Sequence, residues 1–197
     1  MVYTLEQGQK VVKLARRAIT SVFEHSELKI PKEKFLDEKK GCFVTLHLYP
    51  NRELRGCIGI VEPVYSLSKA VVESARSSAF SDYRFEKVGD EELKDTVIEV
   101  SVLSVPEQIK FSKPEELFKK IDIGKDGLIV EFKNMKGLLL PIVAVEYNWD
   151  AEEFVKHTCE KAGLPEDSFK KPGFKIWKFQ TEVFSEEKPD GKVIKKI

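Results

Sequence analysis

The sequence has few cysteines, no excess of either charge and no long apolar run, and each of these absences removes a class of protein. Its three cysteines (Cys42, Cys57 and Cys159) are widely separated, and no Cys-x-x-Cys or Cys/His pair has zinc-finger spacing. An odd, sparse set of this kind indicates a reducing compartment. No stretch approaches the roughly 20 apolar residues of a membrane span, and no apolar signal core follows Met1. We therefore expect a cytoplasmic protein with no membrane partner.

The charge balance argues against nucleic acid as a partner. Thirty-three basic residues offset 33 acidic ones, which leaves no overall field to attract a polyanion. The basic residues of the first predicted helix are best interpreted as a solvated face. Charged residues make up 34% of the chain while Asn and Gln are scarce, a composition that leans toward a heat-adapted source.

Common catalytic signatures are missing as well. The sequence has no Gly-rich phosphate loop, no serine elbow, no His-Glu-x-x-His and no paired-carboxylate motif. We therefore expect no metal and no cofactor, and the residues leave open whether the protein is an enzyme.

Local patterns predict an α+β protein with a largely antiparallel sheet and flanking helices. Apolar residues at helical spacing follow a Thr4–Gln7 capping box, and Ser66 and Asp150 are expected to cap two further helices. Strands are predicted at residues 42–49, 54–61, 96–103, 128–132, 138–140 and 174–183, and Pro141 is expected to end the fifth of them. A capping box at Ser112–Glu115 predicts a short helix before the fourth strand. Most links between these strands are tight turns or short helices, which disfavours a doubly wound parallel sheet. We expect one module over residues 1–197, made of two closely associated subdomains with a boundary near residues 104–114.

The strongest candidate site is the run Leu54-Arg55-Gly56-Cys57-Ile58-Gly59, called here the LRGCIG run. Alternate residues of a strand share a face, so Arg55 and Cys57 are expected to point the same way. A guanidinium beside a thiol favours the thiolate and also binds carboxylates or phosphates. Gly56 and Gly59 remove side chains from both faces, which often marks the close approach of another group.

Each of these residues has a plainer interpretation. A free cysteine in a strand is commonly a small buried hydrophobe. The arginine can pair with an acid across the sheet, Glu99 being one candidate, and the glycines can serve packing alone. A catalytic Cys57 would need a base, and His47 on the preceding strand is one candidate. A three- or five-residue hairpin loop places His47 on the Cys57 face and a four-residue loop places it on the other, so the sequence leaves this register open.

Two further segments carry polar candidates. The loop Asp82-Tyr83-Arg84-Phe85 combines an acid, a phenol and a cation directly after a predicted helix, and loops often carry function. Its plainer role is to end the helix while Phe85 fills the core. Glu99 and Ser101 share one strand face and either line a pocket or form surface ion pairs. We therefore take Arg55, Gly56, Gly59, Asp82, Arg84 and Glu99 as candidate ligand contacts and Cys57 as the candidate catalytic residue.

The LRGCIG run resembles the signature of the AMME chromosomal region (AMMECR-type) family, and the similarity extends over nearly the whole chain. Supporting pieces include residues 78–80, 82–85, 100–104, 127–131, 139–141 and 161–164. Two positions depart from the family pattern, Tyr83 where proline is usual and Ile142 where glutamine is common. If these positions shape a pocket, its details differ here.

The resemblance implies an α+β fold of two associated subdomains with a groove near the LRGCIG run, but it supplies no reaction. It also implies Memo-like and radical-SAM-like proteins as partners in a pathway or complex, because genes of these types are sometimes joined. The sequence therefore predicts a protein that binds a small anionic or polar ligand near this run, as an enzyme or an enzyme subunit. A non-catalytic protein–protein interaction module is the alternative.

Overall fold

The computed structural model describes residues 3–196, and the chain divides into two compact units. Unit 1 comprises the residues up to Leu103 together with those from Glu182 onward, and unit 2 comprises Ser104–Thr181. Strand β7 (Lys175–Glu186) contributes its first residues to unit 2 and its last residues to unit 1. The chain first leaves unit 1 between Leu103 and Ser104.

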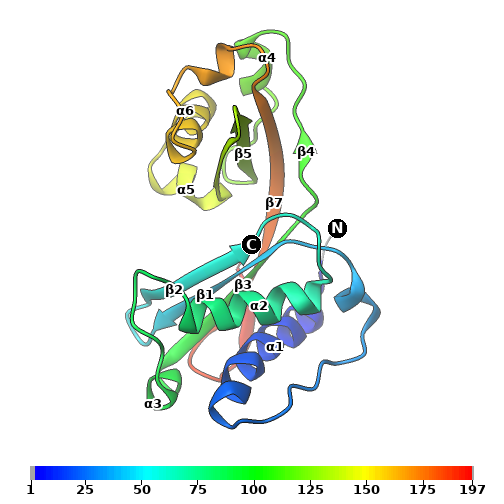
Figure 1. Ribbon diagram of the computed structural model, residues 1–197, viewed down its shortest axis with the longest axis vertical. Helices are drawn as coiled ribbons and strands as arrows, with labels where there is room; N and C mark the ends of the chain where they lie inside the picture. Colours follow the sequence, from blue (N-terminus) through cyan, green and yellow to red (C-terminus); the bar gives the residue numbers. More distant parts are fainter. Residues whose placement is uncertain (1–2, 197) are drawn as a thin grey trace. The chain divides into compact units, whose positions relative to one another are not determined.

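The sheet of unit 1 has the strand order β2–β1–β3–β7, with β8 (Val193–Lys195) paired to the end of β7. β1 (Cys42–Leu48) lies between β2 (Glu53–Ile60) and β3 (Thr96–Leu103) and is antiparallel to both. Helices α1 (Leu5–Phe23) and α2 (Leu67–Phe80) lie side by side on one face of this sheet (Figure 1). β2 is therefore an edge strand with one face against α2.

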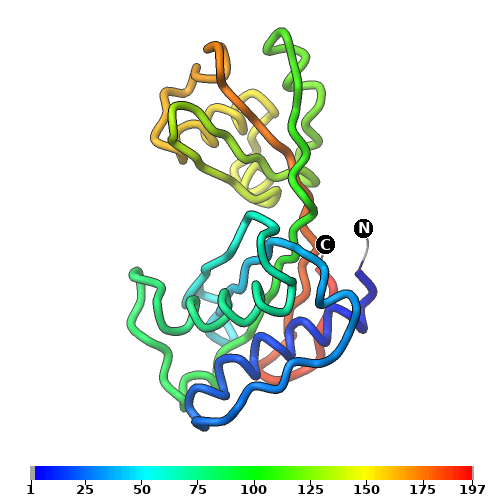
Figure 2. The backbone as a smooth tube through the Cα atoms, turned by 45° about the vertical axis from the view of Figure 1, so that its right-hand side comes forward, coloured from blue at the N-terminus to red at the C-terminus, as the bar shows by residue number. Residues whose placement is uncertain are grey.

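The connection from α1 to β1 is long and mostly irregular. Residues 24–41 run beside α1 back toward the start of β1 (Figure 2) and include the short helix η1 (Lys34–Asp37). Phe35 and Leu36 of η1 are buried in the core of unit 1. Another short helix, α3 (Asp90–Leu93), precedes β3.

A buried ion pair ties the first helix of unit 1 to its last long strand. The guanidinium of Arg16 on α1 donates to both carboxylate oxygens of Glu186 on β7, at 2.7 and 2.5 Å. Glu186 also accepts from the backbone N–H of Ile98 at 2.9 Å, and Arg16 donates to the carbonyl of Thr96 at 2.6 Å. Because both side chains are largely removed from water, each charge depends on the other to offset the free-energy cost of its burial.

Unit 2 has its own sheet and core. Its strand order is β4–β7–β5–β6, from β4 (Glu107–Gln108), the first part of β7, β5 (Asp126–Phe132) and β6 (Met135–Leu139), and each neighbouring pair is antiparallel. The helices are α4 (Pro114–Phe118), α5 (Pro141–Glu146), α6 (Ala151–Lys161) and η2 (Ser168–Lys170). Apolar residues of α6 and β5, with Phe154 and Val130 fully buried, form the centre of this core.

The predicted α+β class with a largely antiparallel sheet is confirmed. Local signals located most elements well: the capping box of Thr4 and Gln7 starts α1, Ser66 caps α2, and Asp150 with Glu153 caps α6. No helix within residues 3–196 is both long and apolar enough to cross a membrane.

Two local predictions were wrong in detail. The expected capping box at Ser112 is not formed: Lys113 occupies the cap position of α4 without a side-chain bond, and the backbone N–H of Ser112 donates instead to the Glu116 carboxylate. Pro141 was predicted only to end a strand, yet it also opens α5. Proline suits a first helical turn because the N–H it lacks would have no partner within the helix.

Candidate functional site

Both glycines of the LRGCIG run lie where a side chain would collide with neighbouring atoms. A Cβ at Gly56 would sit 2.3 Å from the carbonyl oxygen of Ser78 on α2, and a Cβ at Gly59 would sit 2.3 Å from the ring of Phe43 on β1. These distances are far below an ordinary van der Waals contact. Close packing therefore accounts for the absence of a side chain at both positions.

The Ser78 hydroxyl fastens helix α2 to two strands. It donates to the carbonyl of Val44 at 2.7 Å and accepts from the backbone N–H of Ile58 at 2.8 Å. It also lies 2.8 Å from the carbonyl of Ser74 on its own helix. The small residues that the sequence shows along α2 let the helix backbone approach the sheet closely enough for these bonds.

The pairing of β1 with β2 contains a bulge at the LRGCIG run. Leu46 pairs with Gly56 and His47 with Leu54, so Arg55 is an extra residue with no partner on β1. Thr45 lies opposite Cys57, and its hydroxyl is 3.3 Å from the Cys57 Sγ atom. The bulge changes the direction of Arg55 relative to a regular strand.

Arg55 forms a paired, nearly buried cation. Its Nε and Nη2 atoms donate to the two carboxylate oxygens of Glu92 on α3, at 2.5 and 3.1 Å. The partner is thus Glu92 and not Glu99, which lies two strands away on β3. Burial opposes ionisation of Glu92, but the bonds from Arg55 and from the backbone N–H of Gly89 hold the pKa of Glu92 below its ordinary value.

The remaining nitrogen of Arg55, Nη1, is buried and has no hydrogen-bond partner among residues 3–196. The whole residue is only 9% exposed. Buried donors in folded proteins nearly always have an acceptor, so this nitrogen stands out.

The loop after α2 closes over the free edge of β2. The carboxylate of Asp82 accepts from the backbone N–H of Cys57 at 2.9 Å, and the guanidinium of Arg84 donates to the Cys57 carbonyl at 3.2 Å. Arg84 and Asp82 also form a bidentate pair with distances of 2.9 and 2.7 Å. Loop side chains therefore occupy both polar backbone groups of Cys57, as a neighbouring strand would.

Electrostatics keep this loop pair charged. Asp82 is 4% exposed, and the bonds from Arg84, followed by the backbone N–H of Cys57, hold its pKa well below the ordinary range despite the burial. The same carboxylate raises the pKa of Arg84. Tyr83, between them, is 94% exposed, so this departure from the family pattern lies on the surface.

Phe85 links the two arginines. Its ring centre lies 5.9 Å from the guanidinium carbon of Arg55 and 5.4 Å from that of Arg84, within the range of cation–π contacts. We call Arg55, Cys57, Asp82, Arg84 and Phe85, together with Glu92, the β2-edge cluster. It unites the LRGCIG run with the Asp82–Phe85 loop, two segments that the sequence singled out separately.

Cys57 carries an unactivated thiol in this setting. Burial raises its pKa, and the bond from Thr45 and the nearby Arg84 only partly oppose this effect. Cys42 and Cys159 are fully buried, and desolvation raises the pKa of each to about 12. All three cysteines are free, and Cys57 alone among them retains some exposed surface.

Glu99 belongs to a second polar group on the face of the unit 1 sheet opposite to the helices. It lies across from Thr45 and accepts from Lys196 at 2.6 Å, with His47 Nε2 at 3.9 Å and Arg52 at 3.7 Å. Burial disfavours its charge, but the nearby His47 ring and the bond from Lys196 lower the pKa of Glu99 to about 2.

The bulge decides the position of His47. Four residues, 49–52, separate Leu48 from Glu53, and the extra residue Arg55 then returns His47 to the face of Thr45 and Cys57. Its Nδ1 lies 3.1 Å from the carbonyl of Arg52, and its Nε2 is directed toward Glu99. His47 therefore shares a face with Cys57. Its Nδ1 is engaged by the Arg52 carbonyl, while its buried Nε2 lies 3.9 Å from Glu99 and has no hydrogen-bond partner among the described residues.

Sequence patterns assigned no role at the site to three important residues. Glu92, Thr45 and Ser78 hold Arg55, Cys57 and helix α2 respectively, yet each looks like an ordinary helix or strand residue. The acidic run Asp90-Glu91-Glu92 before β3 is a local signal that could have pointed to a partner for Arg55. Within residues 3–196, no group of three His, Cys, Asp or Glu side chains is arranged to hold a metal ion.

Comparison with known proteins gives a consistent result. The AMMECR1 family model matches residues 12–184. A protein of Methanocaldococcus jannaschii is 48% identical over 194 residues, covering 98% of this chain and 96% of its own length. One from Pyrococcus furiosus is also 48% identical, over 197 residues and 97% and 93% of the two chains.

A solved structure supports the same relationship. The crystal structure of an uncharacterized protein from Pyrococcus horikoshii superimposes with a TM-score of 0.87 at 47% sequence identity and covers 96% of each chain. Family model, sequence relatives and fold agree over almost the whole length. The chain therefore belongs to the AMMECR1 family.

Proposed function

We propose that the β2-edge cluster binds a small polar molecule, with Arg55 and Arg84 as its hydrogen-bond donors. The observation that carries this proposal is the Nη1 atom of Arg55, a buried donor with no acceptor among the described residues. A carbonyl, carboxylate or hydroxyl oxygen of a ligand would satisfy it. Two of the three guanidinium nitrogens already hold Glu92, so the third is fixed in direction before a ligand arrives.

The charge of the cluster narrows the class of ligand. Arg55 is neutralised by Glu92, and Arg84 by Asp82. With both cations already paired, the cluster attracts a polyanion only weakly. The pairs instead suit a neutral or singly charged molecule that is rich in acceptor oxygens, such as an amide or a small carboxylic acid.

Cys57 acts in this proposal as a contact and not as a thiolate nucleophile. Its thiol pKa is raised by burial, whereas nucleophilic cysteines carry lowered values. Its backbone is held by Asp82 and Arg84, which presents the Sγ atom in one direction. Binding would therefore be non-covalent, in an enzyme subunit or in a ligand-dependent regulator.

Cys57 also provides the assay, because the other two cysteines are fully buried. Iodoacetamide should alkylate one thiol per folded chain, and the variant C57S should lose that reaction. Free amino acids, small carboxylic acids, amides and sugars would then be tested singly at millimolar concentration for protection of Cys57. We expect protection by at least one oxygen-rich class.

The variant R55K tests the role of the guanidinium. A lysine keeps the charge but cannot bond Glu92 with two nitrogens while offering a third. We expect protection to weaken about tenfold, the effect of losing one charge-assisted hydrogen bond. R76K is the matched control, since Arg76 is a partly buried arginine of unit 1 that bonds the Ala18 carbonyl and Ser21 instead. Equal protection in R55K and R76K would contradict the proposal.

A second candidate function is protein binding through α5. Three apolar side chains in or next to this short helix are exposed: Ile142, Val145 and Tyr147, the last at 66%. Exposed apolar groups that gather in one place are typical of interaction surfaces. We propose Memo-like and radical-SAM-like proteins as the first partners to test, following the resemblance stated above, in the cytoplasm.

Size-exclusion chromatography of mixtures provides the test of this second candidate. A complex formed by the unmodified chain and lost in V145S/Y147S would support it. The surface variant K161Q serves as the control, because Lys161 is an exposed residue of α6. A complex that forms equally well with V145S/Y147S would count against this surface.

A further inference from the structure

Unit 2 contains a cleft of about 480 Å³. Two chain segments, residues 108–114 and 169–174, supply its lining. The volume falls in the range typical of small-molecule sites. We call it the Lys110 cleft, after the lysine that it shares with a neighbouring cleft of about 460 Å³.

The charge of this lining has one sign. Lys110, Lys170 and Lys171 contribute to it, and no carboxylate does. Among the described residues, the ammonium of Lys110 has no acidic partner, and Lys171 has only a 3.6 Å contact with Asp167 between two exposed side chains. Exposed ion pairs of this kind contribute little free energy. The ammonium of Lys170 lies over the Phe169 ring, 5.5 Å from its centre, and it too has no acidic partner among the described residues. None of the three lysines is therefore held by a strong ion pair.

The neighbouring cleft differs from the Lys110 cleft in the charge of its lining. Its lining includes Glu107 and Asp122. Two of its lysines are already engaged: Lys120 donates to the Lys110 carbonyl at 2.7 Å, and Lys178 to the Lys120 carbonyl at 2.9 Å. The Lys110 cleft is therefore the stronger anion site of the two.

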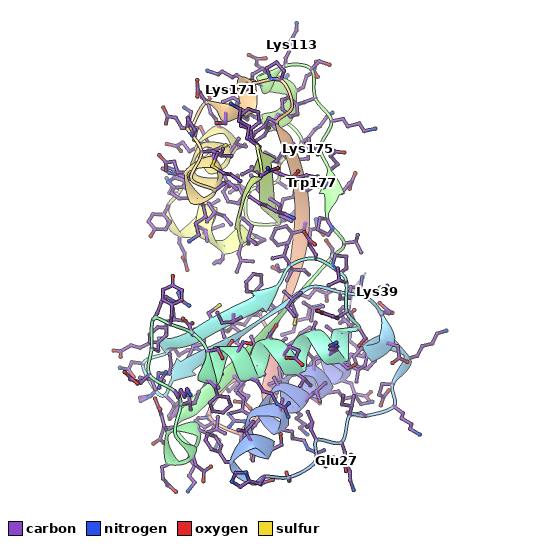
Figure 3. The ribbon with its side chains drawn as sticks, in the orientation of Figure 1. Glu27, Lys39, Lys113, Lys171, Lys175 and Trp177 are labelled. Atoms are coloured by element: carbon purple, nitrogen blue, oxygen red, sulfur yellow. The ribbon has the colours of Figure 1, made fainter. Side chains whose placement is uncertain are left out.

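Aromatic rings form the other part of the lining. Phe111 and Phe174 are half-buried and belong to the lining of the cleft. Phe169 is buried and packs edge-on against Phe118 with ring centres 5.6 Å apart. Gly173, with a φ of +89°, leaves the space beside it open. Lys113 and Lys171 lie at the same end of unit 2 (Figure 3).

We propose that the Lys110 cleft binds a phosphate ester that carries a planar ring, as a nucleoside diphosphate does. Lysine ammonium groups bind phosphate oxygens as point charges, and a base or other flat ring gains contact energy on an aromatic surface. The ring requirement separates this ligand class from simple inorganic anions. The site is independent of the β2-edge cluster, which lies in unit 1.

The test compares three probes on the full chain at low ionic strength: ADP, inorganic pyrophosphate and adenosine. Isothermal titration calorimetry is expected to show the tightest binding for ADP, weaker binding for pyrophosphate and the weakest for adenosine. Affinity for ADP should fall as salt is added, because exposed charges are screened.

Variants separate the two parts of the ligand. K110Q and K170Q/K171Q should each weaken both ADP and pyrophosphate, by about fivefold per lysine, the upper range for an exposed ion pair. F111L should weaken ADP and leave pyrophosphate unchanged. K161Q removes an exposed lysine elsewhere in unit 2 and should change neither affinity. Thermal denaturation of each variant verifies that it is folded.

Three results would overturn the proposal. One is the absence of ADP binding at low salt by the unmodified chain. Another is equal loss of affinity in K161Q and K110Q, which would indicate a diffuse charge effect. The last is tight, lysine-dependent binding of single-stranded oligonucleotides without binding of ADP, which would assign the cleft to nucleic acid.

Discussion

Gly56 offers a sharp test of how the LRGCIG run is built. In G56A, the new Cβ would lie 2.3 Å from the Ser78 carbonyl oxygen, whereas carbon–oxygen contacts normally begin at about 3.3 Å. The backbone of α2 or β2 must therefore move by about 1 Å. That shift strains the bonds from the Ser78 hydroxyl to Val44 and from Ile58 to Ser78, now 2.7 and 2.8 Å long.

The expected cost follows from these contacts. Overpacking a close contact costs about 1–3 kcal/mol, and weakening two buried hydrogen bonds adds about 1 kcal/mol each. We expect G56A to lose about 4 kcal/mol of unfolding free energy, or to melt roughly 8–16 °C lower for a chain of this size. Urea denaturation followed by circular dichroism measures the first quantity, and a thermal scan the second.

Gly89 provides the matched control. A Cβ there meets no atom within 4 Å, and its φ of −88° suits any residue. G89A should lose about 1 kcal/mol or less, the typical cost of changing a helix cap. If G56A is as stable as G89A, the packing argument is refuted, and the glycine would be required for the approach of a ligand instead.

Three further predictions concern ionisable groups. Because burial raises the thiol pKa of Cys57, its alkylation rate should keep increasing above pH 9, and a plateau near pH 7 would reveal an activated thiolate. R55K should lower the free energy of unfolding by about 1–2 kcal/mol. Since the ion pair lowers the pKa of Glu92 in the folded chain, this loss should be present above the unfolded glutamate pKa of about 4.3 and vanish as the pH falls through the folded pKa. A stability difference between R55K and the unmodified chain that persists in acid would contradict this reasoning. E186A leaves Arg16 buried without its carboxylate and should cost about 3 kcal/mol in urea denaturation, whereas a loss below about 1 kcal/mol would show that water replaces the pair.

Local chemistry in the sequence was sufficient to locate most helices and strands. A capping box needs only residues three apart, and for this reason Thr4 with Gln7 and Asp150 with Glu153 marked their helix starts correctly. The alternation of buried and half-buried residues in β1 likewise follows from the sequence of that strand alone. Elements whose signals are weak or shared were missed: Pro141 can end a strand or open a helix, and α5 shows that here it opens one.

The candidate site was predicted in its parts but not in its connections. The sequence identified Arg55, Cys57 and the Asp82–Phe85 loop as separate features. It could not show that Asp82 and Arg84 bind the backbone of Cys57, since those bonds join residues about 25 positions apart. The choice of Glu92 as the partner of Arg55 depends on how α3 packs beside β2.

The sequence by itself determined the fold class, the family and the two segments that meet at the edge of β2, because caps, alternation and turn residues act over a few positions. Only the tertiary structure decided the contacts and the charge states of the residues where these two segments meet. A single extra residue at Arg55 sets the register of the hairpin and the face of His47. Burial raises the thiol pKa of Cys57, and paired carboxylates neutralise both arginines. Such properties depend on distance and desolvation in three dimensions, which no short stretch of sequence contains.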